Sequence, residues 1–233
     1  MKAVIFDVDG VIVDVRESYH YAIKETAEYF LGKEVPLELI KDIKFSKAIN
    51  NDWDVTYEVI RSYGKEVDYN ELVEVFTQIY NRLKYKEKQI LSTELFMKLK
   101  ESGIPLGIVT GRPKEDLDFV LERFGLREFF HTTVDEDDIA DKSLRKPHPF
   151  PLHLCMEKLG AKEGIYVGDN KADYEMVYFY RKIYSKPMKF IHFKEVVNLD
   201  IPADLVAKDE RELKNLLLSE ACPNQEEEQV YLP

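Results

Sequence analysis

The sequence predicts an α/β fold: a doubly wound, mostly parallel sheet with a block of helices inserted after its first strand. Three observations lead to this prediction. Short apolar runs that stop at a polar turn recur along the chain, as at Ala3–Phe6 and Ile165–Val167, and such runs are typical of buried parallel strands. Segments with helical periodicity separate most of these runs. Between residues 15 and 87, however, helical patterns follow one another without a strand.

The first strand ends at two carboxylates. The apolar run Ala3–Phe6 stops at Asp7, Asp9 and Gly10. Open α/β sheets bind ligands outside the carboxyl ends of their strands, so Asp7 and Asp9 can flank one site. Two adjacent carboxylates need a cation or a proton. Mg²⁺ is the expected partner, since it binds a few protein oxygens together with waters and phosphate oxygens. For this segment alone, a strand that ends in a solvated turn is the alternative interpretation.

The segment that follows is expected to form a helical lid over this site. Helical spacing of apolar residues predicts helices over residues 18–31, 36–43, 52–63 and 68–83. A helical block inserted directly after a strand with catalytic character indicates a lid that closes over the site. We therefore divide the chain into a catalytic core (1–14 and 88–218), a helical cap (15–87) and a flexible tail (219–233).

Strands and helices alternate again after the cap. Strands are predicted over residues 104–109, 131–134, 165–167, 189–193 and 204–207, and helices over 94–102, 113–124, 149–159, 172–182 and 210–218. The alternation places further polar groups at strand ends. Thr110 and Gly111 follow one strand, Asp169 follows another, and Lys146 lies in a loop before a helix. The acidic run 135–138 is interpreted as a solvated loop, with help in a distal metal contact as the alternative.

Composition bears on the partners and the location of the protein. The chain has 233 residues, a formal net charge of −11 and a pI near 5.1, which disfavours nucleic acid. Its two cysteines, Cys155 and Cys222, lack metal-ligand spacing and argue against a disulfide framework, which favours a reducing cytoplasm. No signal peptide is recognisable at the N-terminus, and no apolar run reaches the ~18 residues that span a membrane. A monomer and a homodimer both remain open.

Taken together, the polar motifs resemble those of haloacid-dehalogenase-superfamily phosphohydrolases. They are Asp7-Val-Asp9-Gly10, Thr110-Gly111, Lys146-Pro147, and Gly168-Asp169 with Asp173. The resemblance covers residues 1 to about 218. It implies a Rossmann-like core with a helical cap of the C1 type, as in the phosphoglycolate-phosphatase-like members of subfamily I. It also implies a Mg²⁺-dependent phosphatase that acts on a small phosphorylated metabolite.

The resemblance further implies a role for each motif residue. Asp7 would be the nucleophile that becomes a phosphoaspartate, and it would also bind the metal. Asp9 would be the acid/base residue, and its backbone carbonyl would help to bind Mg²⁺. Thr110 would hold the phosphoryl group, Lys146 would steady nucleophile and phosphate, and Asp169 would ligate the metal. The residue types suit these roles, because a carboxylate can serve as a covalent nucleophile and phosphoryl transfer needs charge neutralisation and positioning.

The remaining candidates are less closely defined. Asp173 would be an auxiliary acidic residue of the metal site that orients ligands or Lys146. Gly111 and Arg112 follow Thr110 and are candidate substrate contacts, although Arg112 would equally suit a surface salt bridge. In the cap, Asn51 and Trp53 belong to the cluster Asn50-Asn51-Asp52-Trp53. They can bind substrate hydroxyls and an apolar face, or serve as a helix N-cap and a core anchor.

Asp9 also bears on the choice between related enzymes. The dehalogenase branch lacks an Asp two positions after its nucleophile, and the phosphonatase branch relies on a cap lysine, for which Lys24 is a weak candidate. A sugar phosphomutase shares the Asp-x-Asp pattern and is the main alternative. His20 on the first cap helix can face the site or be a partly buried helix residue. A non-catalytic regulatory protein that retains the fold is a further alternative, and the complete set of motif residues argues against it.

Overall fold

The computed structural model describes residues 2–47, 49, 51–196 and 198–222. Its main sheet has six strands in the order β5-β4-β1-β6-β7-β8, and every neighbouring pair is parallel. The chain therefore steps outward from β1 first to one side and then to the other, which confirms the doubly wound α/β fold. The strands are β1 (Lys2–Phe6), β4 (Leu106–Val109), β5 (Thr132–Val134), β6 (Glu163–Gly168), β7 (Met188–Phe193) and β8 (Leu205–Ala207).

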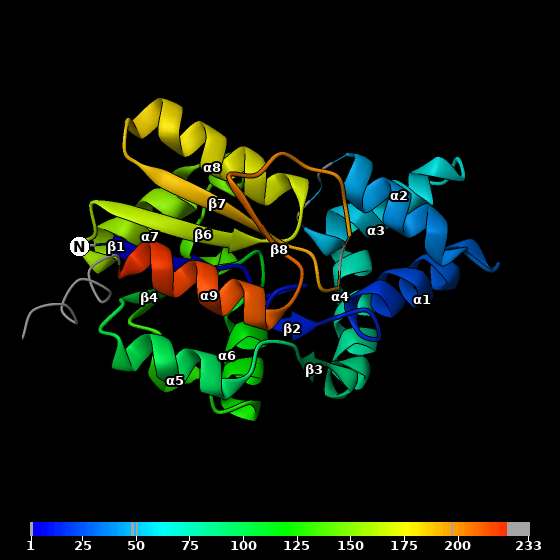
Figure 1. The fold of residues 1–233 in the computed structure, drawn as a ribbon. Coiled ribbons are helices and arrows are strands. Elements are labelled where there is room, and N and C mark those ends of the chain that lie inside the picture. Colours follow the sequence, from blue (N-terminus) through cyan, green and yellow to red (C-terminus); the bar gives the residue numbers. More distant parts are fainter. Residues whose placement is uncertain (1, 48, 50, 197, 223–233) are drawn as a thin grey trace, which may run out of the picture.

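Helices cover both faces of this sheet (Figure 1). α7 (Phe150–Leu159) and α8 (Lys171–Tyr184) pack on one face, and α5 (Thr93–Glu101), α6 (Lys114–Arg123) and α9 (Glu210–Ala221) pack on the other. Ile5 of β1 belongs to the apolar cluster under α7 and α8, whereas Val4 and Phe6 belong to the cluster on the opposite face. Because successive strand side chains alternate between faces, a strand covered on both sides has to be apolar throughout.

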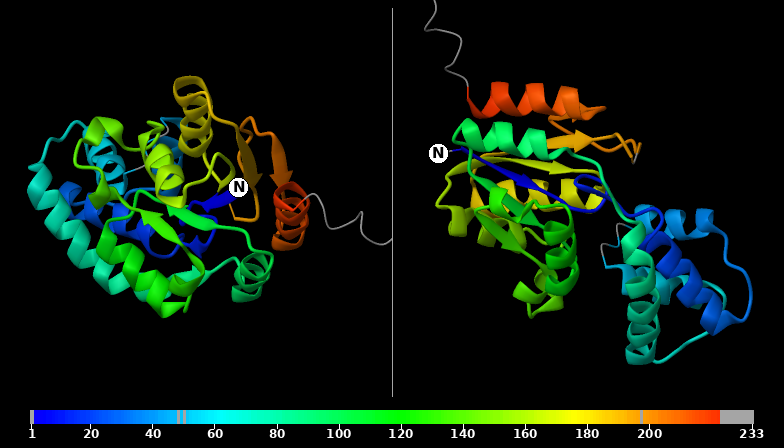
Figure 2. Two further views of the ribbon diagram at one scale, coloured as in Figure 1. Left: turned by 90° about the vertical axis from the view of Figure 1, so that its left-hand side faces the viewer. Right: turned by 90° about the horizontal axis from the view of Figure 1, so that it is seen from below.

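Four further helices form the cap beyond the ends of the strands (Figures 1 and 2). They are α1 (Tyr19–Leu31), α2 (Leu37–Ser46), α3 (Asp52–Ser62) and α4 (Tyr69–Leu83), and α1 packs against the other three. The short strands β2 (Val13–Asp14) and β3 (Lys88–Gln89) pair antiparallel. The two chain segments that enter and leave the cap helices therefore lie side by side.

Most elements lie within a few residues of their predicted positions, with two notable differences. α9 continues to Ala221, three residues into the predicted tail, and Ala221 packs against the apolar core. The acidic run 135–138 is solvated only in part, since Asp137 and Asp138 are exposed. It contains the 3₁₀ turn η3 (Glu136–Asp138), and the side chains of Asp135 and Glu136 are buried. Asp135 is drawn inward because it caps this turn, accepting hydrogen bonds from the backbone N–H groups of Asp137 and Asp138.

Three other 3₁₀ turns complete the described elements: η1 (Lys84–Lys86), η2 (Arg127–Phe129) and η4 (Lys142–Leu144). Of the helices in the described ranges, none has both the length and the apolar character needed to cross a bilayer.

Candidate active site

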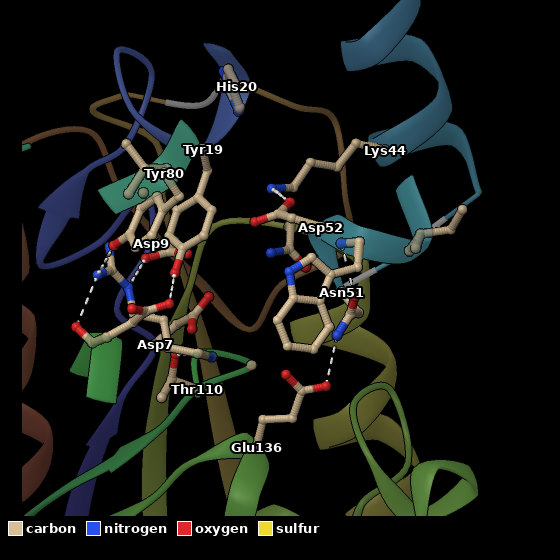
Figure 3. Close-up of a pocket in the computed structure, with 18 of the residues that line it drawn as sticks. Asp7, Asp9, Tyr19, His20, Lys44, Asn51, Asp52, Tyr80, Thr110 and Glu136 are labelled. Carbon is tan, nitrogen blue, oxygen red and sulfur yellow. Dashed lines mark hydrogen bonds and ion pairs between the residues drawn. The ribbon is translucent and has the colours of Figure 1, made fainter. Parts of the chain in front are cut away.

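The carboxyl ends of three neighbouring strands bring the predicted motif residues together. Asp7 and Asp9 follow β1, Thr110 follows β4 and Asp169 follows β6. Since β1 lies between β4 and β6, these side chains line one pocket whose other wall is formed by the cap. Figure 3 shows Asp7, Asp9 and Thr110 on the core side of this pocket and Lys44, Asn51 and Asp52 on the cap side.

Lys146 links Asp7 to Asp173 beneath the pocket. Its Nζ donates to Asp7 Oδ1 at 3.0 Å and to Asp173 Oδ1 at 2.8 Å, and all three residues are buried. Burial alone would lower the pKa of Lys146, but the carboxylates of Asp173 and Asp7 raise it above its ordinary value. The ammonium group therefore stays charged and holds one oxygen of Asp7 in place.

Hydrogen bonds to Oδ1 fix the orientation of the Asp7 carboxylate. Besides Lys146, the backbone N–H of Val8 donates to Asp7 Oδ1 at 2.8 Å, while in the described part of the chain Oδ2 accepts no hydrogen bond. Burial and the nearby carboxylate of Asp173 raise the pKa of Asp7 to about 8. The ionised form is thus costly unless positive charge beyond that of Lys146 is supplied.

Asp169 is the second buried carboxylate whose negative charge a cation would stabilise. Asp7, Asp169 and Asp173 offer carboxylate oxygens that all lie within 4.8 Å of one another. Within the described residues Asp169 makes no ion pair, and burial together with Asp173 raises its pKa well above the ordinary value. Buried, crowded carboxylate oxygens of this kind fit a hard divalent cation such as Mg²⁺.

Asp173 has less capacity left for a metal. Its Oδ1 accepts from Lys146 and from the Tyr166 hydroxyl at 3.0 Å, and its Oδ2 accepts from the backbone N–H groups of Asp169 and Asn170 at 3.1 and 3.3 Å. These contacts fix the turn that presents Asp169. The geometry therefore favours a supporting role for Asp173, with Asp7 and Asp169 as the more available ligands.

Gly10 allows the loop after β1 to approach Asp169 closely. Its φ is +78°, in the left-handed region that favours glycine, and its N–H donates to Val13 O at 2.8 Å to close the turn. A Cβ at this position would lie 2.0 Å from Asp169 Oδ2. A side chain here would adopt an unfavourable φ and would displace the Asp169 carboxylate, which explains the glycine.

Arg112 lies in the pocket wall, and protein groups engage its Nε and Nη1, while its Nη2 has no hydrogen-bond partner among the described residues. Its Nε donates to Asp9 Oδ1 at 2.6 Å, and its Nη1 donates to Glu87 Oε2 and to the Tyr80 hydroxyl, both at 3.2 Å. The guanidinium also stacks over the ring of Tyr19, 5.0 Å from its centroid. Only 2% of Arg112 and 1% of Glu87 is exposed, so this ion pair is shielded from water.

Glu87 connects this network to both ends of the cap. It directly precedes β3, and its Oε1 accepts from Ser18 Oγ and from the Tyr80 hydroxyl, each at 2.9 Å. Ser18 immediately precedes α1, and Tyr80 lies near the end of α4. Asp9 is therefore joined through Arg112 and Glu87 to the two segments that enter and leave the cap.

Asn51 and Trp53 both line the pocket. Asn51 is the N-cap of α3, because its Oδ1 accepts from the backbone N–H groups of Trp53 and Asp54 at 2.9 and 3.1 Å. Its Nδ2 also donates to Glu136 Oε1 on the core at 2.7 Å (Figure 3). Trp53 is half-buried and packs against the apolar core while facing the pocket. Asn50 lies outside the described residues.

Several pocket residues were not predicted as site residues. Lys44 and Asp52 form an ion pair at 2.6 Å in the cap wall, and Glu136 faces them from the core side. His20 does line the pocket, and burial together with Lys44 lowers its pKa to about 3, so it is neutral at pH 7. Lys24 is bound to Glu28 and to the carbonyl of Val35, which removes support for the phosphonatase alternative.

The doubly wound sheet, the carboxylates at its strand ends and the helical lid define a capped α/β hydrolase. A family model described as "Haloacid dehalogenase-like hydrolase" matches residues 4–177. The chain belongs to this family, as its motifs predict.

Curated relatives and solved structures agree with this assignment. A pyrophosphatase PpaX from Halalkalibacterium halodurans is 30% identical over 181 residues, covering 74% of this chain and 77% of the relative. A phosphoglycolate phosphatase from Yersinia pseudotuberculosis is 28% identical over 182 residues, covering 74% and 75%. The structure of phosphatase Tt82 from Thermococcus thioreducens superposes with a TM-score of 0.68 at 25% identity, covering 93% of this chain and 98% of that one.

Proposed function

We propose that the protein is a Mg²⁺-dependent phosphomonoesterase that hydrolyses a small phosphorylated metabolite through an aspartyl-phosphate. The observation that carries the proposal is the buried Lys146, which holds Asp7 at 3.0 Å beside the buried carboxylate of Asp169. The relatives named pyrophosphatase and phosphoglycolate phosphatase support a phosphoryl group as the target.

Asp7 would attack phosphorus with Oδ2, because Oδ1 is held by Lys146 and by the N–H of Val8. The new Asp7–phosphorus bond forms as the bond to the leaving oxygen breaks. Thr110 is placed to hold the phosphoryl group: its Oγ1 accepts from the N–H of Arg112 at 3.1 Å, which leaves its own proton for a phosphoryl oxygen. Bound at Asp7 and Asp169, Mg²⁺ would supply positive charge that offsets repulsion between Asp7 and the phosphate.

Asp9 would move the protons. In the first step it protonates the leaving oxygen, and in the second it takes a proton from the water that attacks the aspartyl-phosphate. Arg112 holds Oδ1 of Asp9 at 2.6 Å, so Oδ2 is the oxygen that carries the proton. We therefore assign Arg112 as a positioning residue for Asp9.

The division of the chain into core (1–14 and 88–218) and cap (15–87) is part of this proposal. Pairing of β2 with β3 next to the limits of the cap supports a hinge at these residues, and closure would exclude water from the pocket. Both cysteines are free, in keeping with the cytoplasmic location that we propose.

Phosphate release from a general substrate, with and without Mg²⁺, tests the proposal. A phosphatase releases phosphate continuously only when the metal is present. A phosphomutase would instead isomerise a sugar phosphate, require a bisphosphate and release little phosphate. A non-catalytic protein with this fold would do neither, and that result would overturn the proposal.

Asp169→Asn is expected to weaken Mg²⁺ binding at the proposed metal site. An amide brings no negative charge to the cation, so the Mg²⁺ concentration for half-maximal activity should rise by at least about tenfold, because loss of even an outer-shell partner of a metal ligand typically costs ~10–100-fold in affinity. Mg²⁺ should also raise the melting temperature of the wild type more than that of the variant, because ligand binding stabilises the folded state. Asp200→Asn, at an exposed loop position, is the matched control. An unchanged Mg²⁺ requirement would exclude Asp169 as a ligand.

Trp53→Ala is expected to affect substrates that reach the cap. The value of kcat/KM should fall at least about tenfold more for benzyl phosphate than for acetyl phosphate, because remote contacts position only a substrate that is large enough to touch them. If Trp53 merely anchors the core, both substrates should lose equally and the melting temperature should drop, as for truncation of a buried aromatic. Equal losses at matched folded fraction would remove Trp53 from the site.

A further inference from the structure

The cationic side chains that line the pocket are each paired with a carboxylate. Over the described ranges, the pairs are Arg16–Asp14 at 2.7 Å, Lys44–Asp52 at 2.6 Å, Arg112–Asp9 at 2.6 Å and Lys171–Glu175 at 3.6 Å. His20 adds no charge at neutral pH. Lys146 lies beneath the pocket, with Asp7 and Asp173.

Lys44 is the cation that a substrate in the cap half of the pocket would meet, and Asp52 neutralises it. Both side chains are largely buried, with 14% and 10% of their surfaces exposed. Burial alone would lower the pKa of Lys44, but Asp52 raises it above the ordinary value, so the ammonium is charged and committed to its partner. Figure 3 shows this pair opposite Asp7 and Asp9, on the far side of the pocket.

Two carboxylates on the core side of the pocket, Asp116 of α6 and Glu136 of η3, also disfavour a second anionic group on the substrate. Asp116 accepts a hydrogen bond from the Tyr19 hydroxyl at 3.0 Å and, within the described residues, has no ion-pair partner. Glu136 is bound by Asn51 and by Arg145. An anionic group placed between the Lys44–Asp52 pair and these core carboxylates would lose water without gaining an unpaired lysine, and would face the two carboxylates.

The rest of the cap wall is largely apolar and aromatic. The side chains are Tyr19, Phe45, Ile49, Trp53, Phe76 and Tyr80. Tyr19 and Tyr80 stack on each other with centroids 4.3 Å apart. A flat apolar group gains favourable contact with such a wall.

We propose that the substrate is a phosphomonoester whose leaving group carries no second anionic group and presents a flat apolar surface to the cap. The Lys44–Asp52 pair is the specificity determinant, because Asp52 cancels the cation that would otherwise receive an anion. This inference rests on the proposed phosphatase activity and names the substrate class of that site. It separates this protein from relatives named for phosphoglycolate and pyrophosphate, each of which bears a second anionic group.

The experiment compares two esters that differ by one carboxylate, benzyl phosphate and 4-carboxybenzyl phosphate, on the full-length enzyme with Mg²⁺. The wild type should show kcat/KM at least about tenfold higher for benzyl phosphate, because like-charge juxtaposition and an unpaired buried anion are both costly. Asp52→Asn releases Lys44 and should reduce this preference by about tenfold, through faster turnover of the carboxylated ester. Asp54→Asn makes the same charge change at an exposed position of α3 and should leave the ratio unchanged.

The outcomes separate the two proposals. If neither ester releases phosphate, the proposed phosphatase function fails. If phosphate is released but the wild-type preference for benzyl phosphate is below about tenfold, only the substrate class is overturned. A preference that Asp52→Asn and Asp54→Asn change equally would overturn the role of the Lys44–Asp52 pair. The wild-type ratio decides the substrate class even if Asp52→Asn fails to fold.

Discussion

Asp7→Asn is expected to abolish phosphate release while the protein stays folded. An amide cannot form the aspartyl-phosphate, so kcat should fall by on the order of 10⁴-fold or more, as for other nucleophile replacements. The fold should survive, since Asn keeps the oxygen that accepts from Lys146 and Val8. Burial raises the pKa of Asp7 to about 8, so at pH 7 folding has to place a proton on a carboxyl that the unfolded chain leaves ionised, and this destabilises the folded state. The neutral amide should therefore not lower the melting temperature.

Phosphate release and thermal unfolding, measured on the same preparation, check this expectation. Asp54→Asn on the cap surface serves as the matched control for loss of one carboxylate. Activity retained within about tenfold of the wild type, a barrier change of only ~1.4 kcal/mol, would contradict the assignment of Asp7 as nucleophile. Loss of activity together with loss of the folded state would leave the nucleophile to be tested at the same position by Asp7→Glu, which keeps the charge but moves the attacking oxygen.

The positions of the core motifs could be predicted from the sequence because they follow from local rules. An apolar run buried on both faces has to be a strand of a covered parallel sheet, and the polar residues that end such runs all reach the same edge. Asp7, Thr110 and Asp169 are placed together by this rule alone. Lys146 lies in a loop, where no periodicity predicts its 3.0 Å contact with Asp7. Only the resemblance of Lys146-Pro147 to a family motif identified it as a site residue.

The cap wall could not be predicted in the same way. The Lys44–Asp52 pair, the Asn51–Glu136 hydrogen bond and the Arg112–Glu87 pair depend on how helices and loops pack in three dimensions, and two of them join the cap segment to the core. Polarity alone suggested that residues 135–138 are solvated. The prediction holds for the exposed Asp137 and Asp138. It is wrong for Glu136, which is buried because partners at residues 51 and 145 satisfy it, and no local pattern reveals these partners.

These long-range contacts connect the cap to the residues around Asp9. Among the described residues, Arg112 is the one side chain that forms an ion pair with both Asp9 and Glu87. Glu87 also accepts hydrogen bonds from Ser18 and Tyr80 at the two ends of the cap. Movement of the cap relative to the core therefore has to change the surroundings of the guanidinium that positions Asp9. Under the proposed mechanism, acid/base chemistry at Asp9 and closure of the cap would be coupled through the buried Arg112–Glu87 ion pair.

Arg112→Met is expected to impair both stability and activity through this pair. It leaves Glu87 buried without a cation, which should lower the free energy of unfolding by about 3–5 kcal/mol. The double variant Arg112→Met/Glu87→Gln removes the stranded charge, so urea unfolding should show much of the lost stability restored. Activity should stay low in the double variant, because Asp9 still lacks the guanidinium that fixes one of its oxygens at 2.6 Å. Arg112→Lys keeps the positive charge but not the planar guanidinium, so its stability and activity should lie between those of the wild type and of Arg112→Met. If the double variant recovered wild-type kcat together with its stability, Arg112 would serve the fold alone and Asp9 would be positioned by other groups.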